Sequence, residues 1–192
     1  MGDFDYRAAW ESGFTWNDYL EKEIREHRGL WEGVWQKSKV PAWALDEGRR
    51  AAGEWRVLVI SEDWCGDASN TVPVIARLAE ALPNLEMRVV KRDENPALMD
   101  RHLTSGSRSI PLAVILRDDF TVAGQWGPRP SELQSFVLTE KKAALRPVGD
   151  IYRDVRTWYA RDRGESTIRE LLGLVEAAVR RAAACEHVAS RT

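Results

Sequence analysis

Hydrophobic and polar positions in the middle of the chain follow the short periods of β-strands. Trp55–Ile60 and Ile110–Leu116 are nearly continuous apolar runs, which is typical of strands buried on both faces. Leu85–Lys91 alternates apolar and polar residues, and Phe120–Trp126 is a shorter run that we expect at a sheet edge. Only a short turn at Asp118-Asp119 separates the last two runs. The pattern therefore predicts four strands, the last two forming an antiparallel hairpin.

A helical period predicts five helices between and after these strands. They are expected at Cys65–Leu82, Asn95–Leu103, Pro130–Leu145, Asp150–Arg161 and Thr167–Cys185. Pro96 stands at the first position of the second helix, where a missing N–H group costs nothing. Thr167 and Glu170 have the spacing of a capping box at the start of the last helix.

The first third of the chain is also predicted to be helical. Apolar residues recur at helical intervals from Trp16 onward. Thr15 and Asp18 have capping spacing just before and within this stretch, although Asp replaces the usual Glu or Gln. We expect Gly29 and Gly33 to break the stretch into pieces.

The order of the central elements is β-α-β-α-β-β-α. Strand–helix–strand alternation calls for a right-handed parallel crossover, whereas the final hairpin is antiparallel. The predicted fold class is therefore α/β, with a mixed four-stranded sheet flanked by helices. Residues 1–53 form an N-terminal helical extension, residues 54–145 form the core, and residues 146–192 form C-terminal helices packed on the same domain.

Composition and charge limit the classes of partner that we expect. The 192-residue chain has a net charge of −2 and a pI of about 6.0, so no basic face favours nucleic acid. The N-terminal stretch lacks the features of a signal peptide, and no apolar run is long enough to cross a membrane, so we expect a cytoplasmic protein without a membrane partner. His27, His102 and His187 have no metal-ligand spacing to the cysteines, and neither a metal nor another cofactor is expected.

The stretch with the clearest chemistry is SEDWCGDASNTVP, residues 61–73. Cys65 follows a predicted strand and begins a predicted helix, where unpaired backbone N–H groups lower the pKa of a thiol. Glu62, Asp63 and Asp67 oppose this effect because like charge disfavours a thiolate. Asp67 is interpreted either as a helix-stabilising acid or as a proton acceptor for Cys65.

Five features carry a resemblance to the thioredoxin family. They are Trp64-Cys65-Gly66, Pro73 eight residues after the cysteine, Asp93-Glu94-Asn95-Pro96 before a helix, Ile110-Pro111 opening a strand, and Gly127 before the last core helix. The resemblance covers roughly residues 54–145. It implies a thioredoxin-like fold and a cis peptide bond between Ile110 and Pro111.

Three positions depart from the family pattern. Ala68 stands where the family has its resolving cysteine, Asp67 replaces the intervening proline, and Val59 replaces a buried acid. Residues at i and i+3 share a helix face, so Ala68 has the position for disulfide exchange but no sulfur. Dithiol cycling through this motif is therefore impossible, and single-thiol chemistry is what remains.

The resemblance assigns a candidate site. Cys65 is the expected nucleophile, and the expected substrate-binding residues are Trp64, Gly66, Asp67, Ile110 and Pro111. Cys65 is alternatively a small buried hydrophobe at a helix start. Cys185 could resolve Cys65 only if its helix packs over the site, and otherwise it is an ordinary helix residue.

Two functions follow from these residues. The first is a thioredoxin-like thiol redox protein that acts through Cys65 alone on proteins or low-molecular-weight thiols and disulfides. The second is a redox-silent thioredoxin-fold module that binds a protein partner. The many tryptophans of the flanking helices either build an interface, including a possible homodimer, or cover the sheet.

Overall fold

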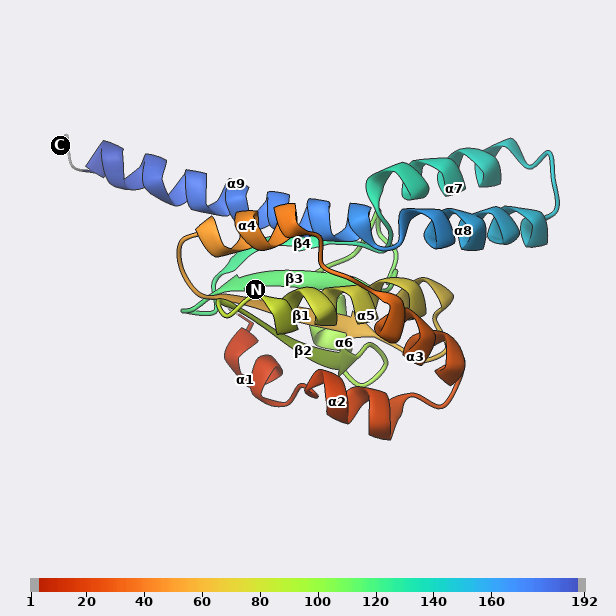
Figure 1. The fold of residues 1–192 in the computed structure, drawn as a ribbon, viewed down its shortest axis with the longest axis horizontal. Coiled ribbons are helices and arrows are strands. Elements are labelled where there is room, and N and C mark those ends of the chain that lie inside the picture. The colour runs from red at the N-terminus through yellow and green to blue at the C-terminus, as the bar shows by residue number, and fades with distance from the viewer. Residues whose placement is uncertain (1–3, 190–192) are drawn as a thin grey trace.

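A mixed sheet of four strands forms the centre of the molecule (Figure 1). The computed structural model describes residues 4–189, with side chains described as far as residue 184. The strands are β1 (Trp55–Ser61), β2 (Leu85–Lys91), β3 (Leu112–Arg117) and β4 (Val122–Trp126), in the order β2-β1-β3-β4. β1 pairs parallel with β2 and antiparallel with β3, which pairs antiparallel with β4. The predicted fold class and hairpin are confirmed.

Burial along the strands explains why their sequences differ. The central strands β1 and β3 are buried at nearly every residue, because helices or loops cover both of their faces. β4 lies at an edge and is buried only at Trp126. The expected boundaries of β2 are confirmed, and β1 runs one residue further than expected, to Ser61.

Five helices follow the predicted ones along the core and the C-terminal part. They are α5 (Gly66–Ala81), α6 (Pro96–Met99), α7 (Ser131–Ala143), α8 (Val148–Asp162) and α9 (Glu165–Ala189). Pro96 begins α6 as predicted, but this helix is shorter than expected because the chain turns at Arg101 and His102 and then forms a bridge between Thr104 and Ser107. None of the described helices is long and apolar enough to cross a membrane.

The predicted capping box of the last helix is wrong. α9 begins at Glu165, and the Asp162 carboxylate accepts hydrogen bonds from the Ser166 N–H and hydroxyl groups. Glu170 instead accepts from the Trp126 indole N–H at 2.6 Å and from the Ser131 backbone N–H at 2.8 Å. Glu170 therefore joins the end of β4 and the start of α7 to α9.

The N-terminal part is helical but divided differently from the prediction. Its elements are α1 (Tyr6–Glu11), α2 (Trp16–Asp18), the π-helical η1 (Tyr19–Glu23), α3 (Arg28–Lys37) and α4 (Ala42–Arg50). The Thr15 cap is confirmed, since its hydroxyl accepts from the Asp18 N–H at 3.2 Å. Gly29 and Gly33 lie inside α3 and break nothing. The break comes at Ile24 and His27, which adopt extended and left-handed backbone conformations.

The N-terminal helices cover one edge of the sheet with aromatic side chains. Phe14 forms a backbone bridge with Val89 of β2, so the open edge of this strand is paired. Trp10, Trp16 and Trp31 are at least nine-tenths buried and belong to the main core. These tryptophans cover the sheet, and the homodimer stays a prediction for a size measurement in solution.

The C-terminal helices occupy two places. α9 runs along β4 and contacts α4 and α5, whereas α7 and α8 form a hairpin that extends beyond the sheet (Figure 1). The hairpin has its own small core of Leu133, Val137, Val155 and Tyr159, against which Trp158 packs.

A buried histidine gives the fold a predictable dependence on pH. His102 Nε2 lies 2.8 Å from the Tyr6 hydroxyl, and Nδ1 donates to Gln125 Oε1 at 2.8 Å, so both ring nitrogens have a partner. Burial lowers the pKa of His102 below its ordinary value. The folded state therefore binds this proton less readily than the unfolded state, and stability is lost as the pH falls below about 6.5 toward the lowered pKa.

We expect His102→Gln to lack this part of the pH dependence. The measurement is the free energy of unfolding in urea at pH 7.5 and pH 5 for both proteins. The parent should lose more stability on acidification than His102→Gln. Equal losses would show that His102 protonates as easily in the folded chain as in the unfolded one.

Candidate functional site

Cys65 lies at the start of α5, directly after β1 and a three-residue loop. It is the N-cap residue of the helix, and its side chain is 8% exposed. The thiol donates to the Ile110 carbonyl oxygen, with 3.5 Å between Sγ and O. The structure thus brings the predicted nucleophile to the Ile110-Pro111 segment, although the two are far apart in sequence.

The surroundings of Cys65 favour the neutral thiol. Burial is the largest effect and raises the pKa of Cys65 above its ordinary value, and the negative charge of Asp67 acts in the same direction. The backbone N–H groups of Ala68 and Asp67 oppose this shift, as expected at a helix start, but do not overcome it. Cys65 is therefore protonated at neutral pH.

The segment facing Cys65 is tightly built. The Ile110–Pro111 and Gly127–Pro128 peptide bonds are both cis. Gly127 has a φ of +123°, and a Cβ atom there would lie 2.3 Å from the Pro111 carbonyl oxygen. Only glycine fits this position, so the chain before α7 packs directly on the Pro111 segment.

Trp64 and Gly66 are the exposed members of the predicted binding residues. Trp64 is 42% exposed, and the Arg92 guanidinium lies over its ring at 4.9 Å from the centroid. Gly66 begins α5 and has open space where a side chain would be. Trp64 therefore offers an apolar surface next to a thiol that is itself almost covered.

Asp67 is joined to two residues that the sequence did not suggest. Its carboxylate accepts from Nε of Arg129 at 2.9 Å and from Nη2 of the same guanidinium. The Tyr159 hydroxyl of α8 also donates to it at 2.9 Å. Asp67 lies in the first turn of α5, as its helix-stabilising interpretation requires, but its oxygens are occupied by distant donors. A free proton acceptor for Cys65 is not what this arrangement provides.

The loop before Cys65 is held by the N-terminal helices. The Asp63 carboxylate accepts from the backbone N–H groups of Arg25 and Glu26, and its carbonyl accepts from the Trp31 indole. Burial alone would raise the pKa of the Asp63 carboxyl, but these two N–H groups, together with those of Trp64 and Asp63 itself, outweigh it and hold the pKa below its ordinary value. The Asp63 carboxylate thus binds the loop before Cys65 to the chain between η1 and α3.

The position of the missing second thiol is fully enclosed. Ala68 has no exposed surface, and neither has Val59, which replaces the family's buried acid. The nearest buried acid in sequence, Glu62, accepts from the Asp93 N–H at 2.9 Å, and burial raises the pKa of its carboxyl. Among the side chains that the structure describes, Cys65 is the only thiol, and the side chain of Cys185 lies outside that part.

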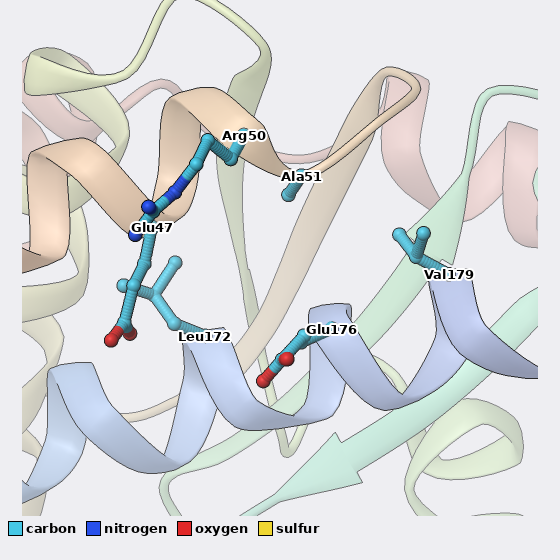
Figure 2. A pocket seen from close by; sticks show the side chains of 6 residues that line it. All are labelled: Glu47, Arg50, Ala51, Leu172, Glu176 and Val179. Atoms are coloured by element: carbon cyan, nitrogen blue, oxygen red, sulfur yellow. The ribbon is translucent and has the colours of Figure 1, made fainter.

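A cavity lies away from this site. It has a volume of about 370 Å³ between α4 and α9, where Glu47 and Arg50 face Leu172 and Glu176 (Figure 2). A second cavity of about 240 Å³ lies between α2 and α5 and includes Trp16. No predicted site residue lines either cavity. Within residues 4–184, no cluster of three or more metal-ligating side chains occurs.

Comparison with known proteins gives a family match and two structural neighbours. The family model described as Thioredoxin matches residues 13–145, which includes most of the N-terminal helical part. A protein of unknown function from Pseudomonas aeruginosa has a TM-score of 0.73 at 18% identity, covering 92% of this chain and 99% of that one. An HIV epitope-scaffold has a TM-score of 0.72 at 18% identity, covering 91% and 99%. No curated protein matched in a sequence comparison.

Proposed function

Because the chain belongs to the thioredoxin family, we propose that it is a thiol redox protein that acts through Cys65 alone. The observation that carries the proposal is the place of Cys65 at the start of α5, with the Asp67 and Ala68 N–H groups favouring its thiolate and the Pro111 segment beside it. Its substrates are disulfides of proteins or of small thiols such as glutathione, in the cytoplasm.

The proposed step is a single exchange. The Cys65 thiol loses its proton to water, and the thiolate attacks one sulfur of the substrate disulfide. A new S–S bond forms to Cys65 while the old one breaks, and its electron pair leaves on the other sulfur, which takes up a proton. Ala68 supplies no second thiol, so the mixed disulfide persists until an external thiol attacks it.

Exposure to oxidised glutathione tests the proposal. A Cys185→Ser variant should gain one glutathione at Cys65 by mass spectrometry. The reaction should be slow at pH 7 and faster toward pH 9, because burial places the thiol pKa above the reference value of about 8.5 for free cysteine. A further Cys65→Ser change should abolish the adduct. A folded protein that remains unmodified at pH 9 contradicts the proposal.

Burial of the thiol favours a second candidate function. Cys65 is 8% exposed and protonated at neutral pH, as suits a redox-silent module that binds a protein partner through the surface around Trp64. In that case Cys65→Ser leaves the cellular phenotype unchanged. If Cys65 instead acts as the single thiol, Cys65→Ser abolishes the protein's function in the cell.

A further inference from the structure

A nearly buried ion pair lies beside the candidate nucleophile. The side chains of Arg129 and Asp67 are 12% and 11% exposed, and the guanidinium binds the carboxylate through two nitrogens. The remaining Arg129 nitrogen, Nη1, donates to Gln134 Oε1 at 2.9 Å. Such two-point contacts between buried ions fix geometry as well as charge. The pair joins the first turn of α5 to the segment that precedes α7.

The Asp67 carboxylate also fixes the hairpin of α7 and α8. Tyr159 belongs to the small core of the hairpin and donates its hydroxyl to Asp67. The negative charge of Asp67 raises the pKa of Tyr159, after burial, which is the larger cause. One carboxylate, two residues after Cys65, thus holds both donors that reach this end of α5.

We propose that Asp67 is a positioning residue that cancels the charge of Arg129 and so lowers the reactivity of Cys65. This inference rests on the proposed function of Cys65. A cation beside a helix N-terminus favours a thiolate, and here the cation is present but already paired. The sequence replaces the family's intervening proline with this aspartate, so the restraint is built into the motif itself.

The charges of Asp67 and Arg129 act in opposite directions on the Cys65 thiol. The Asp67 charge acts to raise the pKa of Cys65 and the Arg129 charge acts to lower it. The other titratable groups near the thiol, on the preceding loop, η1 and α8, are Glu62, Asp63, Tyr19 and Tyr159. A second cation, Arg92, lies over the ring of Trp64 and binds Asp93 at 2.8 Å, and it does not contact Asp67. Arg129 is therefore the cation whose pairing decides the state of the thiol.

Removing the two charges separately tests the inference, in the full chain carrying Cys185→Ser. The measurement is the rate of Cys65 alkylation by iodoacetamide from pH 6 to 10. Asp67→Asn frees the guanidinium and should move the profile to lower pH, with a rate at pH 7 about tenfold higher, which is the change for one pKa unit. Arg129→Met should move it to higher pH. The double variant should lie between them, near the parent.

A matched control removes an equivalent charge elsewhere. Asp154 pairs with Arg146 at 2.6 Å on the hairpin, and Asp154→Asn should leave the alkylation profile unchanged. An Asp67→Asn profile that stays in place or moves to higher pH overturns the inference. If circular dichroism shows that Asp67→Asn does not fold, Arg129→Met decides, and an unchanged profile overturns it.

The alkylation and glutathione experiments test the ion-pair inference and the proposed function separately. A shifted alkylation profile without any glutathione adduct supports the ion-pair inference and contradicts the proposed function. A glutathione adduct at Cys65 together with an unshifted Asp67→Asn alkylation profile supports the proposed function and contradicts the ion-pair inference.

Discussion

Ala68→Cys should give the protein the ability to reduce insulin disulfides, an activity that we expect the parent to lack. Position 68 lies three residues after Cys65 in the first turn of α5, on the same helix face, so an introduced thiol can approach the Cys65 sulfur. After Cys65 forms a mixed disulfide, the introduced thiolate can attack it and release the substrate. Because effective molarities of well-oriented groups reach about 10⁵ M or more, release should be at least about 100-fold faster than with millimolar glutathione.

The controls for this prediction separate sulfur chemistry from packing. Ala68 is fully buried, so a larger side chain costs about 1–3 kcal/mol through overpacking. Ala68→Ser imposes a similar packing cost without a thiol and should remain inactive. Adding Cys65→Ser to Ala68→Cys should remove the gained activity. A folded Ala68→Cys variant without insulin reduction would mean that the two positions do not face each other as α5 places them.

The sheet could be predicted from sequence because each strand carries its own signal. The β-rich runs of β1 and β3 and the alternation of β2 report burial that depends on the local pattern alone. The short turn between β3 and β4 likewise fixes their antiparallel pairing. These boundaries agree with the prediction to within about two residues, the scatter expected of any assignment.

The N-terminal break could not be predicted because its cause is distant. The chain leaves the helical conformation at Ile24, and the next two backbone N–H groups bind the Asp63 carboxylate, 37 and 38 residues away. Glycines are the local signal for a break, which is why the sequence favours Gly29 and Gly33. Tertiary contacts override such weak propensities.

The candidate site divides in the same way. The motif around Cys65 and the Ile110-Pro111 pair can be recognised locally, and the structure brings them within 3.5 Å. Arg129 and Tyr159 bind Asp67 from 62 and 92 residues away in the sequence. Neither residue lies in a sequence motif that predicts this contact. A nearly buried carboxylate requires donors, but the sequence does not show that Asp67 is buried, so it gives no signal for these two partners.

Gly127→Ala should destabilise the fold strongly and disturb the site at the same time. The φ of +123° is unfavourable for any L-residue with a side chain, at a cost of about 1–3 kcal/mol. The new Cβ would lie 2.3 Å from the Pro111 carbonyl oxygen and 3.2 Å from Leu112 Cα, which are backbone atoms that cannot turn aside. Overpacking adds about 1–3 kcal/mol, so a total loss of about 2–6 kcal/mol is expected.

Such a loss is a large part of the free energy of unfolding of a typical domain, which is about 5–15 kcal/mol. Urea unfolding measures it, and Gly124→Ala in β4, three residues before Gly127, is the matched control, because its Cβ would meet Leu174 Cδ2 at an ordinary 3.5 Å. The control should change stability by no more than about 1 kcal/mol. Since Pro111 adjoins the Ile110 carbonyl that accepts from Cys65, the folded fraction of Gly127→Ala should also alkylate faster than the parent. Parent-like stability and alkylation together would show that the Pro111 segment does not depend on the bare backbone of Gly127.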